Sequence, residues 1–267
     1  MHPIERLRMV ARAAGEGPAL LAREAAGALA AFGDDPAGLV TACRRLVDRQ
    51  PMSGPMWWLA ARVLAAGDPA AEAWRAADEV EGDPTPAALC AHLPENGVVT
   101  VLGWGDQVGP ALRRWGGLEV RVVGTGGRWS DLAARLTRAG VDAVDVPESG
   151  TGAAVASASL VLLDAGALGP SGFVAASGSR AAAAVARHEG VPVWVVAGVG
   201  RVLPARLWDA LVARLDAAPE PWLEDDELVP LDLADRVAGP TGLTSPDEAV
   251  RRADCPVVPE LLRGPLG

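Results

Sequence analysis

The stretch from Gly97 to Gly127, GVVTVLGWGDQVGPALRRWGGLEVRVVGTGG, decides the fold of this chain. An apolar run over 98–102 ends in a glycine turn, a helix-like segment covers 107–115, and a second apolar run over 118–123 ends in another glycine cluster. Strand, glycine turn, helix and strand in this order are typical of the start of a parallel α/β sheet. Ligands of such sheets bind outside the carboxyl ends of the strands. We therefore expect a binding site at the end of the sheet that carries the two glycine clusters.

The same alternation continues along the chain. Short, continuous apolar runs separated by helical segments indicate strands that are buried on both faces of a parallel sheet. We expect an extended or loop segment after Ala217, where proline and acidic residues are frequent. The predicted strands are 98–102, 120–123, 143–146, 160–163 and 193–196, and the predicted helices between and after them are 107–115, 130–139, 152–156, 179–189 and 205–215.

The first part of the chain has a helical pattern only. Apolar residues at helical spacing are interrupted by glycine and proline clusters, which predicts a small helical bundle or cap. The turn-forming segment 81–86 is the best candidate for a linker. We therefore expect an α/β protein with an N-terminal helical domain, 1–92, followed by a Rossmann-like parallel sheet domain, 93–267, that binds the ligand. The predicted N-terminal helices lie around 4–11, 19–32, 39–49 and 56–66, with a further one from Asp68.

The composition excludes several classes of function. The 267 residues carry a net charge of -10, and the basic residues are all arginine. Without lysine, a Schiff-base enzyme and a P-loop are excluded. The acidic balance and the absence of a basic run disfavour nucleic acid as a partner.

The same inventory gives expectations about location and metals. No apolar run reaches the ~18 residues of a membrane helix, and the N-terminus lacks the layout of a signal peptide. We therefore expect no membrane partner and a cytoplasmic location. Cys43, Cys90 and Cys255 are far apart in the sequence, which indicates free thiols and no metal site.

Five sequence motifs occur in order along the chain. They are RQPMSGPM at 49–56, VVTVLG at 98–103, the predicted strand and loop at 120–128, the predicted strand and turn at 159–172, and GVPVWVVA at 190–197. Their order and spacing resemble the alpha, beta and delta regulatory subunits of translation initiation factor 2B. They also resemble the enzyme relatives of these subunits, methylthioribose-1-phosphate isomerase and ribose-1,5-bisphosphate isomerase. The resemblance spans nearly the whole chain. It implies a helical N-terminal domain, a Rossmann-like C-terminal domain and a dimer.

The chain departs from this family at the groups that carry the isomerase chemistry. The isomerases use a cysteine after the first strand, where this chain reads Leu102-Gly103-Trp104-Gly105. They also use the aspartate of a Gly-Ala-Asp motif, which falls near Gly166. Their phosphate-binding arginine falls at Glu16-Gly17-Pro18. The arginine of their Glu-Thr-Arg-Pro motif falls near Gly126, two residues from Arg128, and their Asn-Lys pair falls near Ala176-Ser177. Proton transfer between sugar carbons needs a positioned acid and base, so these departures imply a non-catalytic member.

The first glycine cluster contains two candidate ligand-binding residues, Gly103 and Gly105. Glycines before a helix N-terminus suit a phosphate, but they equally suit a tight turn and close helix packing. A dinucleotide site also needs an acid at the end of the second strand, and that end reads Gly124-Thr125-Gly126-Gly127. We therefore expect no cofactor.

The second glycine cluster is the better candidate for an anion. The backbone N–H groups of Gly124, Thr125, Gly126 and Gly127 can form an anion nest, and Arg128 can add a bidentate contact. The alternative is a flexible turn with a solvated arginine.

Four further residues follow predicted strands or begin a predicted helix. Asp164 is the one acid near the position of the isomerase aspartate, and it suits sugar hydroxyls, a general base or an ion pair. Ser177 and Ser179 suit a phosphate or an ordinary N-cap. Arg201 follows the fifth predicted strand, and we expect it to reach the same cleft.

Three other residues are expected to lie outside the site. His188 is expected on the surface, and Trp57 and Trp58 are expected in a core or an interface.

The favoured hypothesis is a non-catalytic relative of factor 2B that binds a phosphorylated sugar or nucleotide and acts as a homodimer. Two alternatives stay open. One is an active phosphosugar isomerase that uses Asp164 with a thiol or acid from another segment. The other is a structural partner subunit with an empty cleft.

Overall fold

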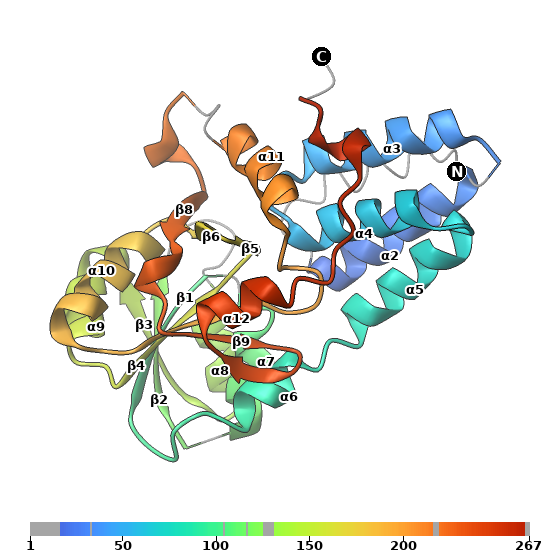
Figure 1. Cartoon of the computed structure of the whole chain (residues 1–267). Helices are drawn as coiled ribbons and strands as arrows, with labels where there is room; N and C mark the ends of the chain where they lie inside the picture. Colours follow the sequence, from blue (N-terminus) through green and yellow to red (C-terminus); the bar gives the residue numbers. More distant parts are fainter. Residues whose placement is uncertain are drawn as a thin grey trace.

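The computed structural model describes residues 17–32, 34–103, 105–115, 117–124, 131–215 and 219–264. The helix predicted around 4–11 and the loop residues Thr125, Gly126, Gly127 and Arg128 lie outside these ranges. In the described part, helices occupy the N-terminal region and a mostly parallel sheet with helices follows (Figure 1). The structure therefore confirms the predicted α/β class.

The main sheet has seven strands in the order β10-β9-β7-β4-β1-β2-β3. All neighbouring strands are parallel except the β9–β10 hairpin at one edge. The five predicted runs are all strands of this sheet. The strands are β1 (Val98–Leu102), β2 (Glu119–Gly124), β3 (Asp142–Pro147), β4 (Leu160–Asp164), β7 (Val193–Val196), β9 (Arg236–Gly239) and β10 (Gly242–Thr244).

Helices cover both faces of this sheet (Figure 1). In β4, Val161 and Leu163 pack in the apolar cluster with the α9–α10 face, and Leu160 and Leu162 pack in the cluster with the α6–α8 face. Neighbouring residues of a strand point to opposite faces, which is why an unbroken apolar run suits this position. The covering helices are α6 (Thr85–Cys90), α7 (Val108–Trp115) and α8 (Leu132–Arg138) on one face, and α9 (Thr151–Ala156) and α10 (Ser179–Glu189) on the other.

The N-terminal helices form a layer beside the sheet (Figure 1). Two of them start with the sequence Asp-Pro, in which proline takes the first helical position and the aspartate accepts from a backbone N–H three residues on. Asp35 accepts from Gly38 N at 2.9 Å, and Asp68 accepts from Ala71 N at 3.1 Å. The helices are α2 (Pro18–Leu29), η1 (Ala30–Phe32), α3 (Pro36–Arg49), α4 (Gly54–Ala65) and α5 (Pro69–Glu81).

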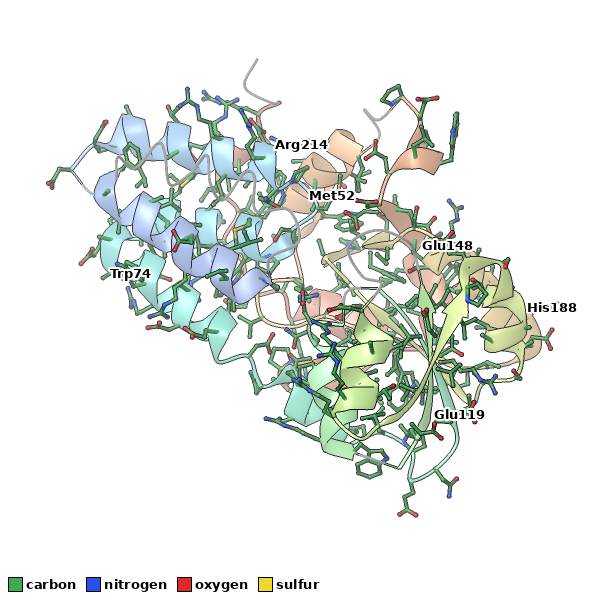
Figure 2. The ribbon with its side chains drawn as sticks, turned by 180° about the vertical axis from the view of Figure 1, so that it is seen from behind. Met52, Trp74, Glu119, Glu148, His188 and Arg214 are labelled. Carbon is green, nitrogen blue, oxygen red and sulfur yellow. The ribbon has the colours of Figure 1, made fainter. Side chains whose placement is uncertain are left out.

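A third apolar cluster joins the helical layer to the C-terminal half. It contains Trp57 and Trp58 of α4, both buried, together with Leu207 and Trp208 of α11 (Ala205–Leu215). Arg214 of α11 lies at the same junction (Figure 2), where its guanidinium is 2.9 Å from Asp48 of α3 and 4.8 Å from the centre of the Trp57 ring. The prediction that Trp57 and Trp58 lie in a core is confirmed.

The structure refines the prediction of an extended or loop segment after Ala217. The described part of this segment adds β9 and β10 to the main sheet and β8 to a small antiparallel sheet of order β5-β6-β8. Its half-buried strands lack the long apolar runs that marked the other strands, so their pairing partners decide their structure. The remaining elements are β5 (Ala167–Gly169), β6 (Gly172–Ala176), β8 (Asp226–Pro230), α12 (Pro246–Arg251), η3 (Glu148–Gly150), η4 (Pro221–Leu223), η5 (Leu231–Leu233) and η6 (Pro259–Leu262).

Candidate functional site

The topology places the candidate site between β1 and β4. From β1 the chain continues to β2 and β3 on one side, whereas β4 is followed by β7 and β9 on the other. The strand order therefore reverses between β1 and β4, which is where open α/β sheets bind ligands. Gly103 follows β1 with a φ of +106°, and a Cβ on it would lie 3.5 Å from Cβ of Asp164, the last residue of β4. Glycine thus permits the chain to turn directly above Asp164.

Asp164 and Arg201 form a buried ion pair at this edge. Their relative exposures are 1% and 2%, and Nη1 of Arg201 lies 3.6 Å from Oδ1 of Asp164. The same Nη1 donates to the Ala165 carbonyl at 2.5 Å, and the backbone N–H of Gln107 donates to Oδ2 of Asp164 at 3.4 Å. Oδ1 of Asp164 has no hydrogen-bond partner among the described residues. The pair is therefore incompletely satisfied, which is unusual for buried charges.

Two carboxyl groups at this edge have raised pKa values, chiefly because they are buried. Burial raises the pKa of Asp164 to about 6, although the Arg201 charge opposes this effect; the charge of Asp106 adds to it. Burial also raises the pKa of Asp106, against the opposing charges of Arg201 and Arg135. A carboxyl group with a pKa near 6 changes its protonation state close to neutral pH, as general acids and bases do.

A clamp from the helical layer fixes the loop that carries Arg201. Oδ2 of Asp83, between α5 and α6, accepts from Val199 N at 2.8 Å and from Nε2 of Gln107 at 3.1 Å. A Cβ on Gly198 would overlap this carboxylate, so a larger residue there would have to displace Asp83 or the loop. Asp83 therefore links the helical layer to the loop after β7 and to the segment beside Asp164.

The start of α4 touches the same loop from another side. The backbone N–H of Gly54 donates to the Gly166 carbonyl at 2.8 Å, and a Cβ on Gly54 would lie 2.9 Å from Cα of Arg201. The helical layer thus closes on the carboxyl ends of β4 and β7.

The start of α10 lies at the end of β1. Gly178, in the left-handed region with a φ of +94°, would place a Cβ 4.0 Å from Cδ2 of Leu102. Ser179 is fully buried, and its Oγ has no hydrogen-bond partner among the described residues. Ser177 is half-buried and donates its backbone N–H to the Asp225 carbonyl at 2.9 Å. A helix start with an unsatisfied serine hydroxyl is able to bind an anion, but Glu227 already accepts from Arg180 N there at 2.9 Å.

The other predicted site residues are not brought to Asp164. A Cβ on Gly105 would contact the Leu132 side chain of α8, and a Cβ on Gly124 would lie 3.4 Å from Oδ1 of Asp145 on β3. Thr125, Gly126, Gly127 and Arg128 lie outside the described residues. The anion nest therefore stays a prediction.

Two of the three cysteines, Cys43 and Cys255, have thiols whose pKa is raised by burial. Burial raises the pKa of Cys43 in α3, and that of Cys255 to about 12, so both are protonated at neutral pH. Cys90 is half-buried at the end of α6, on the face of the sheet covered by α7. A thiol must ionise to act as a nucleophile, and Cys43 and Cys255 do not meet this condition.

Metal-binding groups are not found in the described ranges. No group of three or more His, Cys, Asp or Glu side chains there is arranged to hold a metal ion. His188 is exposed at the end of α10, on the side of the molecule away from the helical layer (Figure 2). Within the same ranges no helix is long and apolar enough to cross a membrane.

Three residues of the site were not chosen from the sequence: Asp106, Gln107 and Asp83. The sequence could have pointed to Asp106, because it is the acid that directly follows the first glycine turn. It could not have pointed to Asp83, because the hydrogen bond of Asp83 to Val199 joins positions that are 116 apart in the chain.

No protein-family model matches this chain, and no curated protein matches its sequence. Solved structures do match it. Translation initiation factor eIF-2B from Pyrococcus horikoshii OT3 has a TM-score of 0.76 at 14% identity, covering 93% of this chain and 98% of that one. The tetrameric eIF2B-beta2-delta2 complex from C. thermophilum contains a chain with a TM-score of 0.73 at 18% identity, covering 93% and 92%.

An enzyme of the same fold also matches. The 5-methylthioribose 1-phosphate isomerase from Pyrococcus horikoshii OT3 has a TM-score of 0.65 at 15% identity, covering 93% of this chain and 86% of that one. These identities are too low to transfer an activity, because one fold hosts many functions. They confirm what the sequence motifs implied about architecture: this chain has the fold shared by the eIF2B subunits and 5-methylthioribose 1-phosphate isomerase.

Proposed function

We propose that this protein binds a phosphorylated small molecule, a sugar phosphate or a nucleotide, at the carboxyl edge between β1 and β4, and that it does not catalyse isomerisation. The observation that carries the proposal is the buried Asp164–Arg201 pair at the point where the strand order reverses. Buried charges with an unsatisfied oxygen lower the stability of the fold, so a pair of this kind is a candidate functional site. A ligand hydroxyl that donates to Oδ1 of Asp164 satisfies that oxygen.

The phosphate would lie away from the carboxylates. Asp106 and Asp164 repel an anion when they are ionised, and Arg201 is already paired with Asp164, so we place the phosphate at donors from elsewhere. The start of α10, with the Ser179 hydroxyl, is one source, and the predicted glycine loop with Arg128 is the other. In this arrangement Asp164 and Arg201 bind the sugar or nucleoside part.

The proposed lack of isomerase chemistry is based on the resemblance to the isomerases. Their cysteine falls in the region Leu102-Gly103-Trp104-Gly105 of this chain, and their aspartate falls near Gly166. Neither glycine nor leucine transfers protons.

We further propose that the protein acts as a homodimer in the cytoplasm, with a helical domain of residues 1–92 and a ligand-binding domain of residues 93–267. The likeness to a subunit of the tetrameric eIF2B-beta2-delta2 complex supports oligomerisation, and the change of sequence pattern near residue 92 supports the two domains. Light scattering of the purified chain tests the dimer directly.

Thermal unfolding in the presence of ligands tests the binding proposal. The panel comprises ribose phosphates, nucleoside monophosphates and NAD, applied to the wild type, to Arg128→Ala and to Arg138→Ala. A ligand at 100 times its dissociation constant adds about 2.7 kcal/mol of stability. We expect one phosphate class to stabilise the wild type and Arg138→Ala, an exposed change on α8, but not Arg128→Ala. No response to any compound would favour a structural subunit with an empty cleft.

One observation favours a second candidate, an active phosphosugar enzyme. Asp164 has a pKa of about 6 and interacts electrostatically with Asp106, whose pKa is also raised. Two carboxyl groups in different environments are a usual acid–base pair. Incubation with ribose-1,5-bisphosphate and methylthioribose-1-phosphate tests this candidate: turnover that Asp164→Asn removes would replace the non-catalytic proposal.

A further inference from the structure

A second pocket lies outside the Asp164 site, on the other side of the loop that carries Arg201. Its volume is about 280 Å³, just below the range of about 300–1,000 Å³ that is typical of small-molecule sites. Its lining residues come from α4 and α5 of the helical layer, from the loop after β7, and from the β9–β10 hairpin and the α12 region. No part of the proposed function uses it.

The walls of this pocket are fixed in place. A Cβ on Gly200 would lie 3.1 Å from the Trp58 ring, so this ring packs directly on the loop backbone. The Trp58 indole N–H in turn donates to the Asp254 carbonyl at 2.6 Å. The backbone N–H of Val199, in the same loop, donates a hydrogen bond to Oδ2 of Asp83 at 2.8 Å. A pocket with such walls does not have to be ordered by its ligand, which favours binding.

The interior of the pocket is apolar and its rim is acidic. Trp58 lines it together with valine and alanine side chains, namely Val199, Val202, Val237 and Ala249. Three charged side chains also line it: Glu79, Arg252 and Asp254.

Only one of these charges lacks a partner. Glu79 is paired with Arg62 at 2.7 Å, and Arg252 is paired with Glu248 at 2.5 Å. The Asp254 carboxylate has neither an ion pair nor a hydrogen bond within the described ranges. The rim therefore carries one uncompensated negative charge beside an apolar interior.

We infer that this pocket binds a small organic cation, an apolar body that carries one ammonium group. The apolar body fills the space between Trp58, Val237 and Ala249, and the ammonium group lies at the rim near Asp254. An exposed carboxylate contributes little affinity but decides which charge is accepted. The inference does not rest on the proposed function, because neither Asp164 nor Arg201 lines this pocket.

The test compares two probes that share a phenyl ring and an ethylene chain but differ in charge, phenethylamine and 3-phenylpropionate. Calorimetric titration at low salt is expected to show binding of phenethylamine about fivefold tighter than binding of 3-phenylpropionate, the upper end for an exposed charge pair. This preference should decrease at high salt because the rim is exposed to solvent.

Two variants separate the roles of the interior and the rim. Ala249→Leu fills the pocket and should abolish binding of both probes, whereas Ala184→Leu, on the exposed face of α10, should bind them as the wild type does. Asp254→Asn, an exposed change that leaves the backbone carbonyl bond to Trp58 in place, should remove the charge preference. The inference is overturned if the wild type does not bind phenethylamine, if it binds both probes equally, or if Ala249→Leu binds them unchanged.

Discussion

Arg201 is the residue on which the charge balance of the site depends. It is 2% exposed and lies 3.6 Å from Asp164, which is 1% exposed. Removing one partner of a buried pair costs about 3–5 kcal/mol, because the other charge stays buried without compensation. We therefore expect Arg201→Met to lower the free energy of unfolding by about 3–5 kcal/mol at pH 8, as measured by urea unfolding.

The loss should depend on pH. The folded-state pKa of Asp164 is raised to about 6, so its protonation stabilises the folded state. This contribution is complete below about pH 4, the usual carboxyl pKa, and is lost as the pH rises through the folded-state pKa. The Arg201 charge lowers that pKa, so Arg201→Met raises it further and its loss of stability should be smaller at pH 5 than at pH 8.

A matched control is Arg187→Met. Arg187 and Asp232 are 3.4 Å apart but 56% and 74% exposed, so this change should cost no more than about 1 kcal/mol at either pH. An equal loss for Arg201→Met at both pH values would show that Asp164 does not titrate in this range.

The sequence identified part of this site. Asp164 and Arg201 both follow apolar runs that were predicted to be strands of one parallel sheet, and the carboxyl ends of such strands lie at one edge. The ion pair between them follows from that geometry. The contributions of Asp83 and Gln107 could not be predicted, because they depend on how the helical layer packs on the loop after β7.

The helix starts of the N-terminal layer are set by two local sequences. Asp35 and Asp68 each precede a proline and accept from the backbone N–H three residues on. Replacing such a cap by alanine costs about 1 kcal/mol, because one N–H of the first turn loses its partner. Asp68→Ala should therefore lower the free energy of unfolding by about that amount, whereas Asp68→Asn, which keeps an acceptor oxygen, should lose only a few tenths of this value. An equal loss in both would contradict the capping role.

The loop after β7 depends on a glycine. A Cβ on Gly198 would overlap the Asp83 carboxylate, so Gly198→Ala must displace Asp83 or the loop. We expect a loss of about 1–3 kcal/mol in denaturant unfolding, the usual cost of overpacking. Gly152→Ala in α9 is the control, since no atom lies within 4 Å of its added Cβ; it should be neutral or gain up to about 1 kcal/mol. A neutral Gly198→Ala would show that the Asp83 clamp is easily displaced.

Elements differed in how well the sequence predicted them. Strands such as β4, which are buried on both faces, are continuous apolar runs and were recognised. β8 reads DELVP and is mostly half-buried, and β10 has only three residues, so neither has a pattern of its own. These strands form because β6 and β9 offer them partners, which is a tertiary effect.

At the scale of the whole molecule, the sequence predicts two domains, and one apolar cluster contains side chains from both of them. The pattern changes near residue 92, and the boundary between two domains at that position stays a prediction. The apolar cluster of the helical layer nevertheless includes side chains from the C-terminal half. These are Ala167, Val174, Leu203, Leu207, Trp208, Leu211, Val258 and Leu261.

A shared core of this kind predicts that the two segments unfold together. Trp57 packs in the same cluster as Trp208 of α11, and Arg214 of α11 is paired with Asp48 of α3. We expect urea unfolding of the full chain to give coincident transitions by tryptophan fluorescence and far-ultraviolet circular dichroism, the behaviour of a single cooperative unit.

The isolated segment 1–92 provides the decisive comparison. Without Leu207, Trp208 and Leu261 it leaves the apolar side of α3 and α4 uncovered, and large buried side chains each contribute about 1.5–3 kcal/mol. That sum is comparable to the whole stability of a small domain, so the segment should show no cooperative transition. A cooperative transition in the isolated segment, or two separate transitions in the full chain, would show that the boundary near residue 92 divides independent folding units. The clamp of Asp83 on the Arg201 loop would then join two such units rather than two parts of one.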